Sequence, residues 1–296
     1  TPGQWTGWFM GDGDEVGKKL KKIAHDEGED GIKKFTYGLR NWGRNFYDDF
    51  YRETKLGRVI YAGGDDFLGV IYSKNPKKPI QPLDAFDWLM TLQNKWSEHG
   101  QQINLSVGFV WVAGSVPQRD VLQHCRDAED RAKKLNRNRV TIRVLFNSGQ
   151  YVEWTCPWNY LDILKDYCDR DDNTYEEWEL NGRKEQYKPN WSHVYGDLAQ
   201  LKNRHAFGLA ENRRRQIGEL NTASEGQIID NRRAFLDFFE MYFPNWGDKL
   251  RKNEKLLVGA NDDTSLVQRA NLMISWVENL ITIGWHLCSD ISSSSD

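Results

Sequence analysis

Two apolar segments joined by Gly-Gly-Asp-Asp constrain the fold of this chain more than any other stretch. Residues 58–62 and 67–72 are rich in β-branched and aromatic side chains, and the four turn residues occupy positions 63–66. The pattern predicts a strand, a tight turn and a returning strand. Gly63 and Gly64 would let a bulky charged ligand approach the backbone. The competing interpretation is an ordinary hydrophilic turn, because glycine and aspartate are common turn residues.

A second acidic turn follows the apolar segment 5–10 and contains Asp12 and Asp14. If this segment is a strand beside the hairpin, both aspartates come close to Asp65 and Asp66. Neighbouring carboxylates repel each other unless a cation lies between them. Mg²⁺ or Mn²⁺ takes such oxygen ligands and leaves positions for phosphate oxygens, and two such ions commonly serve nucleotidyl transfer. We therefore predict a metal site at these four aspartates, with Asp12, Asp65 and Asp66 as catalytic residues.

The order of the expected elements places both turns in one sheet. Helices between residues 15 and 57 and the hairpin are followed by a helix over 83–96, a strand over 103–112, a helix over 118–135 and a second hairpin over 139–154. This order predicts an α+β fold with a ferredoxin-like plan, in which an antiparallel sheet carries helices. In that plan the first strand lies beside the first hairpin at the centre of the sheet.

Several further motifs occur in the order of a known family. They are Leu-Ser-Val-Gly at 105–108, Ala-Glu-Asp-Arg-Ala-Lys at 128–133 and Arg-Asn-Arg-Val at 137–140. With the two acidic turns, they resemble the Cmr-like catalytic palm of the large polymerase/cyclase subunit of type III CRISPR effector complexes. More distantly, the chain is similar to the GGDEF diguanylate cyclase domain, whose motif ends in Glu-Phe where this chain has Asp66-Phe67.

The resemblance implies an ATP-dependent nucleotidyltransferase that makes cyclic oligoadenylate when target RNA is bound to the complex. It implies two Mg²⁺ or Mn²⁺ ions, and as partners the other complex subunits, guide RNA and target RNA. Ser106 would lie near the base or ribose, and Lys133 would reach the phosphates, so that the expected nucleotide-binding set is Gly63, Gly64, Ser106 and Lys133. From spacing alone, Lys133 and Lys134 would merely complement the dipole at the end of their helix.

The sequence changes character after about residue 155. Segments with helical period and many tryptophans follow, and 169–173 is a charged link. We predict a palm domain over 1–154 and a helical domain over 155–296, which in the resembling family contacts the small subunits. The arginines at 213–215 could touch RNA phosphates, although basic helix residues more often face solvent.

Composition narrows the class of protein. The 296 residues are 39% hydrophobic, which allows ample core, and no apolar run approaches the ~20 residues of a membrane span. No leader pattern follows Thr1, so we expect no signal peptide and a chain cut from a longer protein. The cysteines lack any Cys-x-x-Cys pair and predict inert thiols in a reducing cytoplasm. They are Cys125, Cys156, Cys168 and Cys288.

Three functional interpretations stay open at this point. The first is the cyclic oligoadenylate synthase, favoured because all its acidic positions are filled. The second is a diguanylate-cyclase-like enzyme that uses GTP, and the third is a catalytically silent structural fragment of the ribonucleoprotein complex. In the resembling family two palms face each other, and a nuclease domain often precedes both. We therefore expect little product from this chain alone, and expect a second palm from self-association or from another chain.

Overall fold

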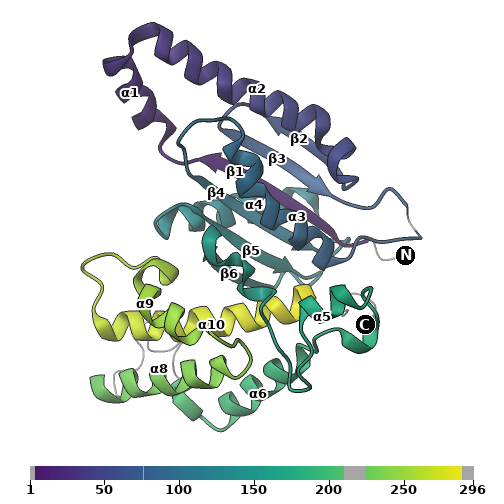
Figure 1. Ribbon diagram of the computed structural model, residues 1–296, viewed down its shortest axis with the longest axis vertical. Helices are drawn as coiled ribbons and strands as arrows, with labels where there is room; N and C mark the ends of the chain where they lie inside the picture. The colour runs from purple at the N-terminus through teal and green to yellow at the C-terminus, as the bar shows by residue number, and fades with distance from the viewer. Residues whose placement is uncertain (1–3, 76, 210–223, 289–296) are drawn as a thin grey trace. The chain divides into compact units, whose positions relative to one another are not determined.

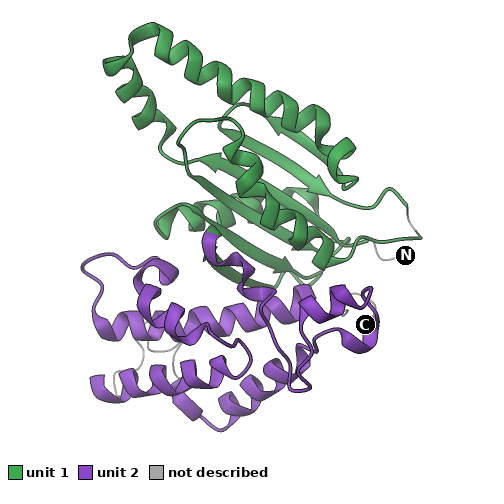
Figure 2. Cartoon of the chain, viewed as in Figure 1, with its two compact units in different colours: residues 1–158, 292–296 green, residues 159–291 purple. Residues whose placement is uncertain are grey.

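The protein forms two compact units. The computed structural model describes residues 4–75, 77–209 and 224–288, so the arginines at 213–215 lie outside the described residues. The first unit ends at Trp158 and the second begins at Asn159 (Figure 2).

The first unit is built on a six-stranded sheet (Figure 1). Its strands are β1 (Thr6–Gly13), β2 (Arg58–Ala62), β3 (Asp66–Ile71), β4 (Leu105–Val112), β5 (Arg139–Leu145) and β6 (Tyr151–Pro157). They are ordered β2-β3-β1-β4-β5-β6 across the sheet. β1 therefore lies in the interior, between β3 and β4, as the ferredoxin-like plan requires.

Helices connect these strands and decide their directions. They are α1 (Val16–Asp26), α2 (Gly28–Thr54), α3 (Pro82–Ser97) and α4 (Gln118–Lys134). The α+β fold class is confirmed, and β2-β3-β1-β4 is its ferredoxin-like part. The sheet differs from the expected antiparallel one at a single pair, because β4 and β5 are parallel. α4 forms a crossover between these two strands, and a crossover of this kind lets neighbouring strands run in the same direction.

One face of the sheet packs against α2 and α3. The ring of Phe9 in β1 points to this side, with its centroid 5.7 Å from that of Phe50 in α2 and 4.5 Å from that of Trp88 in α3. Side chains alternate between the two faces along a strand. Met10 and Asp12 therefore belong to the opposite face from Phe9, which α2 and α3 do not cover.

α4 packs on this second face, and Gly108 of β4 allows the helix to come close. A Cβ atom at Gly108 would lie 2.4 Å from the backbone oxygen of Cys125 and 2.6 Å from the backbone nitrogen of Glu129. Any larger residue would push the helix off the sheet. Apolar side chains from α4, β4 and β5 fill the rest of the contact. The last turn of α4, which contains Lys133, is therefore held over the second face by backbone contact.

The second unit is mainly helical, as the fold class predicts. Its α-helices are α5 (Tyr175–Leu180), α6 (Ser192–Asn203), α8 (Glu225–Glu240), α9 (Gly247–Val258) and α10 (Leu266–Cys288), and its 3₁₀ segments are Trp158–Leu164, Glu185–Tyr187 and Ala206–Gly208. Trp191 is buried here and stacks on Tyr167, with ring centroids 4.2 Å apart. Among the described helices of both units, none has the length and apolar character needed to cross a membrane.

Candidate active site

Three carboxylates are brought together where β1 ends and β3 begins. Asp12 lies directly opposite Asp66 in the antiparallel register. The N–H of Gly13 donates a 2.7 Å hydrogen bond to the backbone carbonyl of Asp65. Residues directly opposite each other in such a pair project from the same face, with Cβ atoms about 4.5–5.5 Å apart. The structure thus gathers the three aspartates that the sequence nominates as catalytic.

The charge of this group is incompletely balanced. Burial raises the pKa of Asp65, and the negative charges of Asp12 and Asp66 raise it further, while Lys133 acts in the opposite direction. A carboxyl group whose pKa is raised by its neighbours gains from the arrival of a cation. A nearby cation would therefore favour the charged form of Asp65.

Lys133 lies beside the aspartates, at the carboxyl end of α4. Its Nζ atom is 2.8 Å from Oδ2 of Asp12 and 2.6 Å from Oε1 of Glu129. Although burial lowers the pKa of Lys133, the hydrogen bonds to these two carboxylates raise it on balance. The ammonium group therefore stays charged in the centre of an acidic site, where it can turn to a triphosphate.

Glu129 is a member of the site that the sequence analysis missed. It is only 7% exposed, and burial raises its pKa while Lys133 opposes the shift. The available signal was its spacing, because Glu129 and Lys133 are four residues apart on one helix and such pairs lie on one face. Glu129 orients the lysine toward Asp12.

Asp14 and Ser106 were expected to bind metal and nucleotide, and they are found bound to each other. The hydroxyl of Ser106, which is fully buried, donates a 2.7 Å hydrogen bond to Oδ1 of Asp14. The backbone N–H of Asn138 donates a 2.9 Å bond to Oδ2. Asp14 thus ties the end of β1 to β4 and to the loop that follows α4. Both residues are placed at the site, and their roles as ligand contacts stay predictions.

The two glycines of the hairpin differ in the space around them. Gly64 has φ of 124°, a conformation that side chains rarely adopt, and a Cβ atom there would meet nothing within 4 Å. An added Cβ atom at Gly64 would thus point into open space, but the residue itself is buried, and its role in nucleotide binding stays a prediction. At Gly63 a Cβ atom would lie 1.8 Å from the hydroxyl oxygen of Tyr61. The space at Gly63 is already filled by this tyrosine.

A basic groove borders Asp14 and was also missed from the sequence. It has a volume of about 520 Å³ and is lined by Asp14 and Glu15 together with Lys18, Lys19, Lys22 and Arg137. Four cations outnumber two anions, so the groove favours a phosphate-bearing ligand. The lysines look like an ordinary solvated helix face in sequence, and only the fold brings Arg137 to them.

The three aspartates suit Mg²⁺ or Mn²⁺ in ligand chemistry, since both ions prefer carboxylate oxygens. Their oxygens do not yet surround one point. Within the described ranges, one group of three acidic or imidazole ligand atoms falls within 4.8 Å of one another, and it is Asp169, Asp171 and His193 of the second unit. Mutual repulsion among the carboxylates and the bond from Lys133 to Asp12 explain the wider spacing at β1 and β3.

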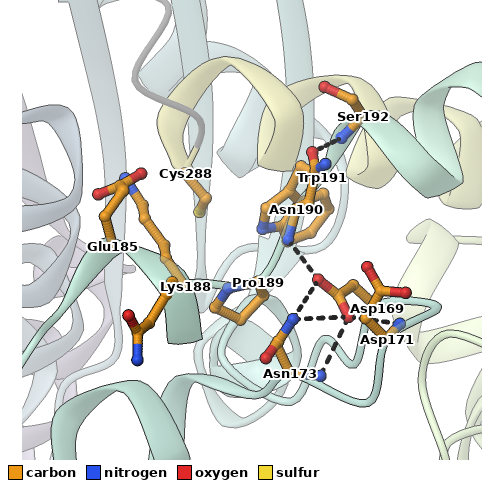
Figure 3. A pocket seen from close by; sticks show the side chains of 11 residues that line it. Asp169, Asp171, Asn173, Glu185, Lys188, Pro189, Asn190, Trp191, Ser192 and Cys288 are labelled. Carbon is orange, nitrogen blue, oxygen red and sulfur yellow. Dashed lines mark hydrogen bonds between the residues drawn. The ribbon is translucent and has the colours of Figure 1, made fainter. Parts of the chain in front are cut away.

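Within the group in the second unit, Asp169 holds a loop through its hydrogen bonds (Figure 3). The carboxylate of Asp169 accepts hydrogen bonds from the backbone N–H groups of Asp171, Asn173 and Asn190, at 2.8, 3.0 and 2.8 Å. Nδ1 of His193 lies 3.3 Å from another backbone N–H. The group borders a pocket of about 480 Å³. Its strongest oxygen ligands are already satisfied by the chain itself.

Comparison with known proteins identifies the first unit. Residues 6–141 match the family profile described as Cas10/Cmr2, second palm domain. These residues are similar to the palm domain of Cas10-like large subunits. The matched range contains Asp12, Asp65, Asp66 and Lys133, and the resemblance to the large subunit of type III CRISPR complexes is confirmed. No curated protein sequence matches the chain.

One solved structure supports this fold. A Csm1-Csm4 cassette in complex with cA3 matches with a TM-score of 0.50 and 14% identity, over 96% of this chain and 36% of that chain. The cassette in complex with one ATP has a TM-score of 0.47 and 17% identity over the same shares. Csm1 of T. onnurineus has a TM-score of 0.45 and 14% identity, over 94% of this chain and 38% of that chain. The present chain thus spans little more than a third of these proteins.

Proposed function

We propose that this palm domain is a metal-dependent nucleotidyltransferase that uses ATP and contributes to cyclic oligoadenylate synthesis in a type III CRISPR complex. The observation that carries the proposal is the placement of Asp12 opposite Asp66, with Asp65 beside them, where burial and the charges of both neighbours raise its pKa. A strand pair that concentrates three carboxylates has little structural purpose without a cation.

The proposed reaction joins two nucleotides. The 3′ oxygen of one nucleotide bonds to the α-phosphorus of an ATP, the bond from that phosphorus to pyrophosphate breaks, and the 3′ hydroxyl gives up its proton. Divalent ions, when bound, lower the pKa of that hydroxyl and stabilise the charge on the departing pyrophosphate. Asp12, Asp65 and Asp66 would hold two such ions, Mg²⁺ or Mn²⁺.

The phosphates would lie between the aspartates and the basic groove. Lys133 would leave Asp12 when a metal ion takes its place, and would then face the triphosphate with Glu129 still holding its other side. Lys18 and Arg137 add positive charge next to Asp14. Such preplaced charges stabilise a developing anion without reorganisation.

Adenine is the proposed base, because a fold relative is in complex with cA3 and the motif ends in Asp66 where GGDEF domains have glutamate. A pocket that hydrogen-bonds one purine edge rejects the other, since its own polar groups would stay unpaired. ATP should therefore displace a fluorescent ATP analogue at least tenfold better than GTP does. Stronger displacement by GTP would replace the adenylate proposal by the diguanylate one.

The partners proposed are the other subunits of a type III complex, with guide and target RNA. The solved relative is a cassette of Csm1 with Csm4, and we extend that kind of assembly to this chain. Bond formation needs an attacking oxygen held about 3–3.5 Å from phosphorus, and such positioning supplies much of the rate. One palm offers one nucleotide site, so the acceptor requires a second palm. The isolated chain should make product only on self-association.

Calorimetry with ATP and Mn²⁺ tests the metal site. The variant Asp65→Ala/Asp66→Ala should lose the Mn²⁺-dependent part of ATP affinity, about 100-fold or more, and keep its helical and sheet signal in circular dichroism. Asp48→Ala/Asp49→Ala is the matched control, because this pair is also adjacent but lies on α2. Equal ATP affinity in the first variant and the wild type would remove the metal site from the proposal.

A further inference from the structure

A β-bulge in β2 turns one side chain toward the carboxylates. Val59 pairs with Gly69, but the next pair is Tyr61 with Leu68, so Ile60 is an extra residue. Residues two apart on a regular strand share a face. The bulge breaks that rule and places Val59 and Tyr61 on opposite faces. Bulges next to functional sites commonly redirect a side chain in this way.

The register shows which face Tyr61 joins. Leu68 pairs with Met10 of β1, and two residues further along each strand Asp66 pairs with Asp12. Cross-strand partners project from the same face, so Tyr61 belongs to the face of Asp12 and Asp66. If the same residues paired regularly, with Ile60 opposite Leu68, Tyr61 would stand opposite Phe67, whose ring packs against α2 and α3. The bulge therefore places Tyr61 on the same face of the sheet as the carboxylates.

Tyr61 contacts Asp66 directly. Its hydroxyl donates a 3.1 Å hydrogen bond to Oδ1 of Asp66. That bond, with the charge of Asp66, raises the pKa of Tyr61. A Cβ atom at Gly63 would lie 1.8 Å from the phenol oxygen and 2.8 Å from Oδ1 of Asp66. The glycine thus leaves room for the tyrosine to reach the carboxylate.

We propose that Tyr61 is a positioning residue for Asp66, and that Gly63 keeps the path between them clear. The inference rests on the proposed function, in which Asp66 binds a divalent ion. A carboxylate with one oxygen fixed by a hydroxyl directs its other oxygen, and partners of this kind tune metal affinity by about 10- to 100-fold. Because the phenol of Tyr61 is 49% exposed, its bond adds little to folding stability.

Mn²⁺ titration followed by electron paramagnetic resonance tests the proposal, with ATP present. Tyr61→Phe keeps the ring and removes the donor, and should weaken Mn²⁺ binding about tenfold without changing the melting temperature. Tyr47→Phe is the matched control, because Tyr47 is similarly exposed, at 52%, on α2. It should bind Mn²⁺ like the wild type. Equal Mn²⁺ affinity in Tyr61→Phe and wild type would overturn the positioning role.

A second variant tests the part played by Gly63. Gly63→Ala should displace the phenol and also cost about tenfold in Mn²⁺ affinity, whereas Gly196→Ala, which meets nothing within 4 Å, should cost none. In a Tyr61→Ala background, Gly63→Ala should add less than about threefold, since the two changes act on one contact. If the losses of Mn²⁺ affinity from the two substitutions were fully additive, Gly63 would act independently of Tyr61. That result would overturn the proposal that Gly63 keeps room for the contact between Tyr61 and Asp66.

The outcomes separate the inference from the function on which it rests. If the wild type binds Mn²⁺ with ATP and Asp65→Ala/Asp66→Ala does not, the metal site stands, and Tyr61→Phe alone decides the positioning role. If the wild type binds no Mn²⁺, the proposed function fails and the inference is overturned with it.

Discussion

This chain has two groups of acidic residues that offer similar candidate metal ligands but have different surroundings. At the end of β1 and the start of β3, Asp12, Asp65 and Asp66 come together with Lys133 as a basic partner. In the second unit, Asp169 and Asp171 lie with a histidine, and their ligand atoms are closer together. Proximity alone would favour the second group as the metal site.

The pKa values of the two groups point the other way. Burial and two neighbouring carboxylates raise the pKa of Asp65. Burial also disfavours the charge of Asp169, but N–H groups of Asn190, Asn173 and Asp171 outweigh it and lower the pKa. A carboxylate that already accepts several hydrogen bonds gains less from a cation. Whether an acidic group suits a metal ion is therefore best judged by how few hydrogen bonds its oxygens already accept, rather than by how close the oxygens are to one another.

Removing the central carboxylate of each group should lower stability by very different amounts, and the largest effect is expected at Asp169. Asp169→Ala leaves the N–H groups of Asp171, Asn173 and Asn190 without this acceptor, which should lower the free energy of unfolding by about 3 kcal/mol. Asp65→Ala should lower it by less than about 0.5 kcal/mol. Urea denaturation followed by tryptophan fluorescence measures both. Similar losses in the two variants would erase the distinction.

Mn²⁺ binding measured without nucleotide provides a second comparison of the two acidic groups. Asp65→Asn should weaken Mn²⁺ binding about 30-fold, because it removes a ligand that the metal stabilises. Asp169→Asn/Asp171→Asn should leave Mn²⁺ affinity within about twofold of the wild type wherever the variant remains folded, as circular dichroism would show. A loss of Mn²⁺ binding in the second variant would instead make the loop of the second unit a metal site.

Much of the fold and the core of the site could be predicted from sequence, because the signals are local. Turn residues and alternating apolar residues define the hairpin around Asp65 and the strand before Asp12. A topology with few solutions then brings them together. The parallel pairing of β4 and β5 depends on where α4 returns the chain to the sheet, and no sequence motif predicts that position.

The parts of the site that could not be predicted depend on contacts between distant segments. Ser106 is 92 positions from Asp14, and their hydrogen bond appears only once β1 and β4 are adjacent. The role of Tyr61 depends on an extra residue in β2, and a bulge of this kind has no clear sequence signature. Arg137 joins the basic groove through the loop after α4. Local patterns carry no information on such contacts.

The smallest expected effect is on how folding stability depends on pH. Asp65 and Asp169 should affect this dependence with opposite signs. Asp65 has a raised pKa in the folded state, so protonation favours folding. Its stabilising contribution is full below the ordinary pKa of aspartate, about 3.9, and is lost as the pH rises through the raised value. Asp169 has a lowered pKa, so its contribution is present above about pH 3.9 and is lost as the pH falls through the lowered value.

Melting temperatures of Asp65→Asn and Asp169→Asn in EDTA, from pH 7 to pH 3, test these signs. Asparagine cannot ionise, so Asp65→Asn should melt slightly above the wild type at pH 7, and the difference should vanish toward pH 3. Solvent screens Asp65, which is partly exposed, so the gain should stay below about 1 kcal/mol. Asp169→Asn should melt below the wild type at pH 7, with the gap narrowing only under pH 4. If both variants shifted in the same direction at pH 7, the two groups would share one electrostatic character, and the preference for β1 and β3 as the metal site would lose its physical basis.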